Sequence, residues 1–287
     1  MRPLSPQAQG LIAINIAAVI FGTAALYGKL AVSPFWIASM RSAFAALALL
    51  AVALWNGGAA VPERKFWMSG VVTGFLLAVH WLTFFASVQL AGVAIATLTF
   101  ATFPLFTVLI AAWHQKRTPH LAELAAAIAI ILAVALLVNP RNANASVPGA
   151  AAGLASGLIY ALLWHASKPL SGAVPRLRVS LYQNTAAALA LAPFLPFAPP
   201  MPVHIEDWGW LALLGIVNTA VMLQLYLYAL QRISASTCSG FVALEPVYAI
   251  LLAALFFHEP VTVWIVFSAV LIIGASLTLL RLEAAPE

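Results

Sequence analysis

The sequence predicts an all-α integral membrane protein with ten transmembrane helices. Three observations predict it: 64% of the 287 residues are hydrophobic, only 7% are charged, and long apolar stretches recur along the whole chain. Soluble domains carry about 25% charged residues. This chain has too little polar surface for a soluble globule, so we expect lipid to be its main solvent.

The apolar stretches have the length of membrane-spanning helices, about 20 residues each. They lie near residues 10–30, 35–55, 66–88, 91–113, 120–139, 148–168, 178–198, 207–230, 233–257 and 261–281. Short breaks rich in Pro, Gly and Asn separate them. The first stretch has no clean cleavage site of small residues, so we interpret it as a retained transmembrane helix and not as a signal peptide.

The basic residues predict the orientation in the membrane. Ten spans place both termini on one side. That side would hold ten of the 13 basic residues, and the other side only Lys29 and Arg141. Cytoplasmic loops are enriched in Lys and Arg, so we expect both termini in the cytoplasm and the chain in a bacterial inner (plasma) membrane. The basic residues are scattered and form no stripe that would bind nucleic acid.

The residues that carry redox, metal or nucleotide chemistry are sparse. Cys238 is the single cysteine, which excludes an internal disulfide, and the six histidines fall on different stretches. The chain contains neither an H-E-x-x-H pattern nor a phosphate-binding G-x-x-x-x-G-K-[ST] loop. We therefore expect no cofactor or metal, and neither a membrane-embedded enzyme nor an ATP-driven pump is favoured.

Glu245 is the one carboxylate placed deep inside an apolar stretch. A charge at that depth costs about 2.5–3.5 kcal/mol on insertion scales, so it normally faces a bundle interior or a wet cavity. Pro246 follows it and removes a backbone donor, which bends a helix. The pair predicts a substrate path at mid-membrane. The alternative is a structural carboxylate paired with a Tyr, Asn or Arg in the packed bundle.

The two halves of the chain resemble each other. A shift of 142 residues overlays 80–117 on 222–259 without a gap and matches Pro104 with Pro246. Five spans in each half is an odd number, so the second copy would enter the membrane in the opposite orientation. Inverted repeats are typical of transporters. We expect one repeat at about 9–140, the other at about 147–283, and an outward-facing linker at about 140–147. One chain then completes one cavity, so we expect a monomer.

These features resemble the EamA type of the drug/metabolite transporter superfamily, over nearly the whole chain. The resemblance rests on a lysine closing the first span of each half (Lys29, Lys168), Arg41 early in span two, and the mid-helix prolines Pro104 and Pro246. The run Leu-Glu-Pro-Val-Tyr at 244–248 is especially similar, and within the family the chain most resembles YddG-type exporters. The resemblance implies a ten-helix basket of two inverted five-helix repeats around a central cavity, and the export of aromatic and other large neutral amino acids.

Polar and aromatic side chains inside the spans are the candidates for contact with a small-molecule cargo. His80 and Phe84 share a helical face in span three, and Tyr160 and Trp164 share one in span six. The full set of candidate cavity residues is His80, Phe84, Thr99, Phe103, Tyr160, Trp164, Gln183, Asn184, Tyr226, Glu245 and Tyr248. Core packing, helix–helix hydrogen bonding and the aromatic belt are the competing interpretations.

Arg41, Lys29, Lys168 and the two prolines are expected to have structural or gating roles. Arg41 lies within a span and needs a partner. Glu245 is the candidate, because their depths differ by only about 4 Å at 1.5 Å rise per residue. Three functions stay open: an amino-acid exporter, an exporter of another small metabolite or drug, and a membrane protein without transport activity. Nucleotide cargo would need more cavity cations than Arg41 and the two lysines supply.

Overall fold

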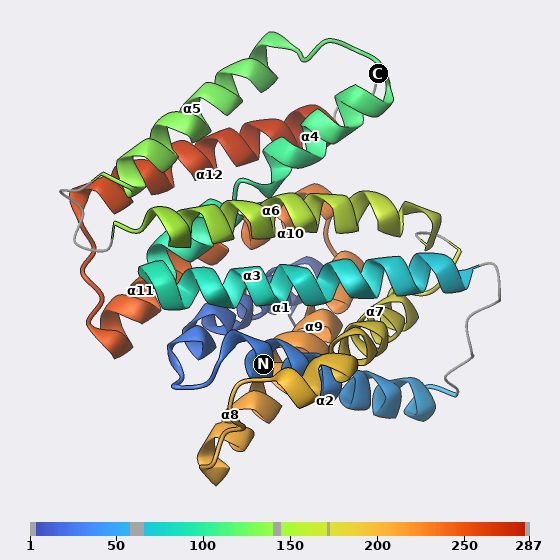
Figure 1. Ribbon diagram of the computed structural model, residues 1–287. Helices are drawn as coiled ribbons and strands as arrows, with labels where there is room; N and C mark the ends of the chain where they lie inside the picture. Colours follow the sequence, from blue (N-terminus) through green and yellow to red (C-terminus); the bar gives the residue numbers. More distant parts are fainter. Residues whose placement is uncertain (1–3, 58–65, 140–144, 171–172, 285–287) are drawn as a thin grey trace.

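The computed structural model describes residues 4–57, 66–139, 145–170 and 173–284, and these form helices and turns with no β-strand. Helices α3 and α6 lie side by side through the middle of the molecule (Figure 1). Helices α4, α5 and α12 lie on one side of them, and α1, α2, α7, α8 and α9 on the other. Most of the predicted linker, residues 140–144, lies outside the described residues, as do Arg2, Arg64, Lys65 and Arg141.

The helix bounds follow the predicted stretches. In the first half they are α1 (Pro6–Thr23) with the 3-10 turn η1 (Ala24–Lys29), α2 (Pro34–Trp55), α3 (Trp67–Phe100), α4 (Phe103–His114) and α5 (Leu121–Leu137). In the second half they are α6 (Val147–Ser167) with η3 (Lys168–Leu170), α7 (Arg176–Leu191) with η4 (Ala192–Phe197), α8 (Ile205–Gly215), the π-helical turn η5 (Ile216–Val221), α9 (Met222–Leu230), α10 (Ala235–Val242), α11 (Glu245–Phe257) and α12 (Val263–Ala284).

The starts of three helices are encoded by a serine followed by a proline in the first turn. The hydroxyls of Ser5, Ser33 and Ser146 each accept a hydrogen bond from the backbone N–H three residues later. This satisfies a donor that the helix itself leaves free. Proline suits the same first turn because its missing N–H has no helical partner there. The sequence therefore fixes where α1, α2 and α6 begin.

Seven helices within the described ranges are long and apolar enough to cross a membrane. The expected count of ten does not follow from length alone. One reason is that α3 runs from one predicted span into the next as a single 34-residue helix. The other is that α4 and α5 have only 12 and 17 residues, and α7 has 16. The chain is a multi-pass membrane protein.

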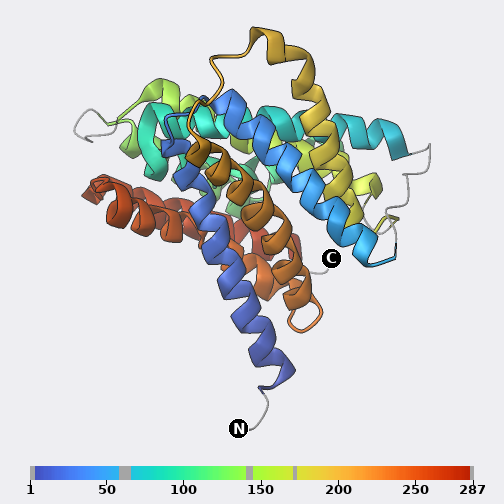
Figure 2. The same cartoon turned by 90° about the horizontal axis from the view of Figure 1, so that it is seen from below.

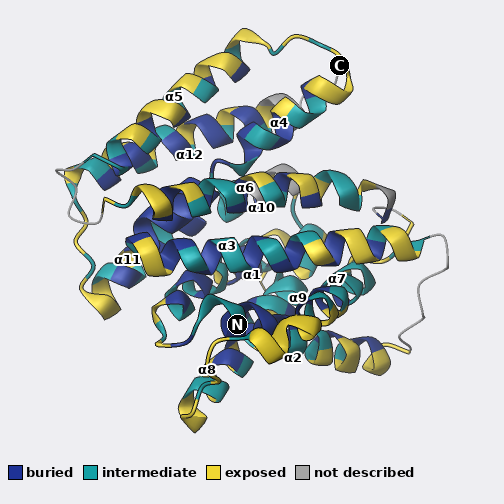
Figure 3. Ribbon diagram, in the orientation of Figure 1, coloured by how far each residue is buried: buried dark blue, intermediate teal, exposed yellow. Residues whose placement is uncertain are grey.

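The outward faces of the helices are apolar. On α5, Ile128 and Ile131 are 60% and 65% exposed, and on α11 Leu251 and Leu255 are 60% and 66% exposed. Exposed residues follow the outer side of α5 in Figure 3. A soluble monomer rarely keeps contiguous apolar patches of this kind. Lipid tails would cover them without requiring any polar partner.

Two breaks occur at matching places in the two halves. Residues 101–102 separate α3 from α4, and residues 243–244 separate α10 from α11. Helix α4 begins at Phe103 and α11 at Glu245, which are 142 residues apart, and each has proline as its second residue. The sequence prediction that these prolines interrupt their spans is confirmed, because proline cannot donate to the preceding turn.

Helix α6 packs tightly against α3 through Gly149, Gly153 and Gly157, whose four-residue spacing predicts a close approach of another helix. A Cβ atom added to Gly153 would overlap Thr99 Oγ1 and lie 2.9 Å from Ser87 Oγ. The Ser87 hydroxyl also donates to the backbone carbonyl of Gly149 at 2.7 Å. Because both helices carry candidate site residues, this contact sets the geometry of the site.

Gly153→Leu should destabilise the folded protein by about 1–3 kcal/mol, the usual cost of overpacking a close contact. Thermal unfolding and size-exclusion chromatography of the purified protein in detergent would measure this. Gly274→Leu is the matched control, because no atom lies within 4 Å of its Cβ position. Equal melting temperatures for both variants would contradict the close α3–α6 approach.

Candidate functional site

Seven rings from three helices form a contiguous group in the core, which we call the aromatic cluster. Neighbouring ring centroids lie between 4.3 Å and 6.2 Å apart. Such spacings are typical of edge-to-face and offset contacts between aromatic side chains. The cluster consists of His80, Trp81, Phe84, Phe85, Phe100, Phe103 and Tyr160.

Local structure explains why these rings meet. His80 and Phe84 are four residues apart on α3 and therefore share a face. Phe100 ends α3 and Phe103 begins α4, so the break between the helices places both rings together, stacked at 5.5 Å. Tyr160 on α6 completes the group, and its ring centroid lies 5.1 Å from that of Phe103.

His80 is buried, with 1% of its surface exposed. Its Nδ1 atom is 2.8 Å from the Ser156 hydroxyl and 3.2 Å from the Ser156 carbonyl oxygen, which fixes the ring against α6. Its Nε2 atom has no hydrogen-bond partner among the described residues. One ring nitrogen is thus anchored, and the other is buried and unpaired.

Arg41 lies at the centre of the bundle and is 1% exposed. Its guanidinium carbon lies 3.5 Å from the centroid of the Trp81 ring, a cation–π contact. Its Nε and Nη1 atoms have no hydrogen-bond partner. The predicted ion pair with Glu245 is wrong: neither charge is among the ion pairs found between described residues. Equal depth does not ensure contact, because the packing of α2 on α3 directs Arg41 to Trp81.

Glu245 is the first residue of α11 and is 5% exposed. The N-terminus of a helix favours a carboxylate, because its free N–H groups carry partial positive charge. Helix α11 packs against α3, which carries most rings of the aromatic cluster. Glu245 is therefore a buried carboxyl group on a helix beside the cluster, with no ion pair to Arg41 or to another described residue.

The polar residues predicted in spans four and seven make hydrogen bonds to their own helix or to an adjacent one. Thr99 is buried and donates to the carbonyl of Ile95 at 2.6 Å. Gln183 donates to the Ser167 hydroxyl at 2.9 Å. Asn184 is 3% exposed and donates to its own helix, whereas its Oδ1 atom has no partner. Only Asn184 of this group keeps a free buried acceptor.

Two predicted tyrosines lie outside the aromatic cluster. Tyr226 packs with α1 and α10 in a separate apolar group. The Tyr248 hydroxyl lies 3.4 Å from Asn15 Oδ1 on α1, and its Cβ approaches Gly22 closely. Both residues hold α1 against the second half of the chain.

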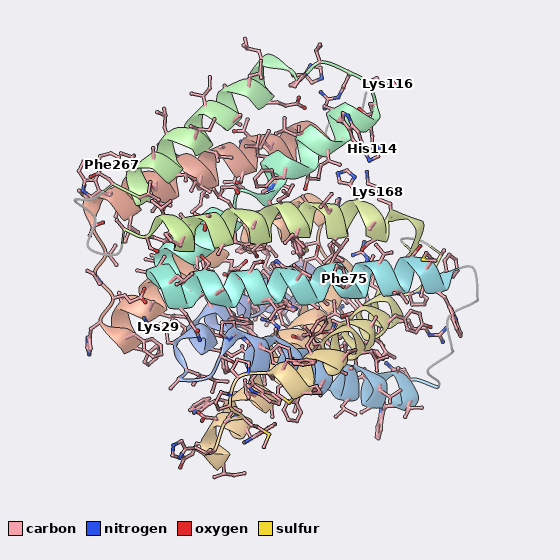
Figure 4. All side chains as sticks on the ribbon, in the orientation of Figure 1. Lys29, Phe75, His114, Lys116, Lys168 and Phe267 are labelled. Atoms are coloured by element: carbon pink, nitrogen blue, oxygen red, sulfur yellow. The ribbon has the colours of Figure 1, made fainter. Side chains whose placement is uncertain are left out.

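Helical spacing places Trp164 and Lys168 on one face with Tyr160, but neither side chain belongs to the aromatic cluster. Trp164 is 54% exposed and Lys168 is exposed, near the end of α6. Lys168 lies toward the same end of the bundle as His114 and Lys116, and Lys29 lies at the opposite end (Figure 4). The two predicted lysines therefore mark opposite ends of the molecule.

No pattern in the sequence indicates the partner of Lys29. Lys29 Nζ is 2.8 Å from Glu259 Oε1, with only 10% of the Glu259 side chain exposed. The same carboxylate accepts the backbone N–H of Val93 at 3.0 Å, next to Gly92, where φ is +81° and the helix kinks. This arrangement, which we call the Glu259 bridge, ties η1, α3 and the α11–α12 loop together at one end.

Two shallow hollows open on the surface. One has a volume of about 420 Å³ and is lined by the end of α4, from Ala112 to Arg117. The other, about 400 Å³, is lined by Arg176 at the start of α7 and by the end of α9. His114 and Lys116, at the first hollow, lie at the end opposite Lys29 (Figure 4).

The described residues contain no group of three or more His, Cys, Asp or Glu side chains that could hold a metal ion. What the site offers is a cation, a carboxylate, an imidazole and a wall of rings within a membrane-embedded bundle. These groups can bind and orient an organic molecule.

The family comparison decides the class of the protein. The model of the EamA-like transporter family matches residues 8–139 and again residues 147–281. The chain belongs to the EamA-like transporter family. Figure 2, seen from below Figure 1, shows the helices of both matched segments packed into one bundle.

Two relatives are described as transporters. An "Uncharacterized transporter" of Archaeoglobus fulgidus is 26% identical over 255 residues, which cover 88% of this chain and 89% of that protein. The "Uncharacterized transporter YxxF" of Bacillus subtilis is 22% identical over 212 residues, covering 72% and 68%. A solved structure described only as "Crystal structure of protein" matches with a TM-score of 0.65, at 22% identity, and covers 98% of this chain and all of that one. It supports the fold alone.

The Glu259 bridge should hold its end of this EamA-family protein closed. In a Cys238→Ser background, Val88→Cys would place a thiol behind the bridge, since Val88 is 1% exposed and packs against Gly28. Adding Glu259→Gln should raise the rate of labelling by a water-soluble maleimide about tenfold, as expected for losing a charge-assisted contact. Glu206→Gln, which removes an exposed carboxylate, is the control. An unchanged rate would show that the bridge does not restrain this end.

Proposed function

We propose that this protein is a secondary transporter of the bacterial plasma membrane that exports aromatic and other large neutral amino acids by alternating access. The observation that carries the proposal is the aromatic cluster, buried in a transporter-family bundle beside unpartnered polar groups. Rings offer apolar area to an aromatic side chain, and His80 and Arg41 offer polar atoms to a backbone. Binding sites for small molecules combine these two kinds of surface.

The ten-span inverted repeat belongs to this proposal. The family matches twice, once in each half. The breaks before Phe103 and Glu245 recur at the predicted spacing of 142 residues. Ten segments result if α3 is divided at the Gly92 kink, its last part is joined to α4, α8 is joined to α9, and α10 is joined to α11. The site then lies where the two repeats meet, as in other inverted-repeat transporters.

Alternating access would use the two ends in turn. The Glu259 bridge restrains one end, and both hollows open near residues of loops rich in Lys and Arg. The positive-inside rule assigns the Lys116 and Lys168 end to the cytoplasm, together with both termini. The proline breaks in the two interrupted spans would absorb the backbone changes of opening and closing. One chain completes the site, so a monomer would suffice.

The charges of the site favour a zwitterionic or uncharged cargo. Arg41 and Glu245 balance each other, so a cargo with a large net charge would leave uncompensated charge in the membrane interior. A nucleotide would need several cations. Another small metabolite or drug of low net charge is the alternative cargo, and the printed names of the two relatives state no cargo.

Counterflow of labelled amino acids in proteoliposomes tests the proposal. The wild-type protein should exchange phenylalanine, tryptophan and leucine. Tyr160→Ala should lower the rate about tenfold or more through loss of a stacking ring, whereas Tyr160→Phe should retain most of it. Trp55→Ala removes a tryptophan that is 91% exposed and serves as the control.

The result can fail in two distinct ways. No exchange of any amino acid by folded, inserted protein would overturn the amino-acid cargo and leave another metabolite or a protein without transport activity. Exchange that is insensitive to Tyr160→Ala would place the binding site outside the aromatic cluster.

A further inference from the structure

Arg41 has more hydrogen-bonding capacity than its surroundings use. Two of its three guanidinium nitrogens have no partner, although the side chain is 99% enclosed. An arginine that serves only the fold normally has its donors satisfied, because a buried unpaired donor is costly. Trp81 covers one face of the guanidinium. Stacking of this kind leaves the in-plane N–H donors free for a planar carboxylate.

Unpartnered polar atoms gather on the helices around Arg41. Helix α2 packs against α3, α7, α8 and η5. Buried polar atoms without a hydrogen-bond partner among the described residues occur on α2 and on three of these elements. They belong to Ser39 and Ser42 on α2, Trp81 on α3, Asn184 on α7, and Asn218 and Thr219 on η5. A packed membrane interior rarely leaves several buried polar atoms unpaired. These atoms on α2 and its neighbours are hydrogen-bonding capacity that a polar ligand would use.

Glu245 is a second buried ionisable group, 5% exposed. No ion pair joins it to Arg41 or to another described residue. The aromatic cluster extends from Trp81, which lies under Arg41, to Tyr160 on α6. Glu245 begins α11, which packs on α3, the helix that carries Trp81. A molecule that carries a carboxylate and an ammonium group a short distance apart, with a ring beside them, would pair with Arg41 and Glu245 at the same time.

We propose that Arg41 receives the carboxylate of a zwitterionic cargo, that Glu245 receives its ammonium group, and that its side chain packs on the aromatic cluster. This inference rests on the proposed transport function and names the groups that recognise the cargo. Arg41 lies in the first half of the chain and Glu245 in the second, so a bound cargo would contact both halves. A guanidinium binds a carboxylate through parallel N–H donors, which a lysine cannot reproduce.

The test pairs cargo analogues with single variants. L-phenylalanine carries both charges, 2-phenylethylamine lacks the carboxylate, and 3-phenylpropionate lacks the ammonium. Competition against labelled phenylalanine in wild-type proteoliposomes should rank phenylalanine at least about tenfold above each analogue, the usual weight of a charged hydrogen bond. Quenching of tryptophan fluorescence on the purified protein gives an independent measure of binding.

Each variant should erase one preference and spare the other. Arg41→Gln should weaken phenylalanine about tenfold or more and change 2-phenylethylamine by less than about threefold. Glu245→Gln should weaken phenylalanine about tenfold or more and change 3-phenylpropionate by less than about threefold. Arg281→Gln, which removes an exposed arginine at the end of α12, is the matched control and should retain the wild-type ranking.

The outcomes separate the two proposals. Folded Arg41→Gln and Glu245→Gln that keep the wild-type ranking, or weaken all three compounds alike, overturn the assignment of poles and leave amino-acid export standing. Wild-type protein that binds none of the compounds overturns both. If Arg41→Gln does not fold, Arg41→Lys replaces it: loss of the preference over 2-phenylethylamine supports the assignment, and retention overturns it.

Discussion

The close approach of α3 and α6 determines where the other parts of the site can lie. Small residues on α6 let the two backbones come together, and the contact is reinforced by hydrogen bonds from Ser87 and between His80 and Ser156. Without this contact, Tyr160 would not reach the rings of α3 and α4. In lipid, such packing has no strong hydrophobic drive of its own and depends on shape and on interhelical hydrogen bonds.

Burial of charge is the second constraint, and the molecule meets it in two ways. Glu245 and Glu259 both interact with the N-terminal side of a helical segment: Glu245 is the first residue of α11, and Glu259 accepts the N–H of Val93 just after the kink. Glu259 has a direct cationic partner and closes one end. Glu245 has none, which leaves it able to interact with a bound molecule.

Patterns along the chain predicted those features that depend on local backbone chemistry. The Glu245-Pro246 break and the glycine face of α6 follow from what proline and glycine do to any helix, and the structure contains both. The family, too, was evident from the chain, and the double family match confirms it. Because the chain belongs to this family, it is a membrane transporter.

Features that depend on helix rotation and on long-range contact could not be predicted in this way. The Arg41–Glu245 pair was inferred from depth alone, and depth does not specify which neighbour a side chain faces. Trp164 shares a face with Tyr160 by spacing, yet it lies one turn farther along α6, where neighbouring helices leave it exposed. The Glu259 bridge joins residues 230 positions apart, for which no local pattern exists.

The kink at Gly92 has a consequence for how this end of the protein moves. A Cβ there would lie 3.0 Å from Glu259 Oε1, and the backbone has a conformation that favours glycine. The kink in α3 and the Lys29–Glu259 ion pair therefore share the Glu259 carboxylate. When Glu259 moves away, the backbone N–H of Val93 loses its acceptor, so opening of the ion pair and bending of α3 at Gly92 would be coupled.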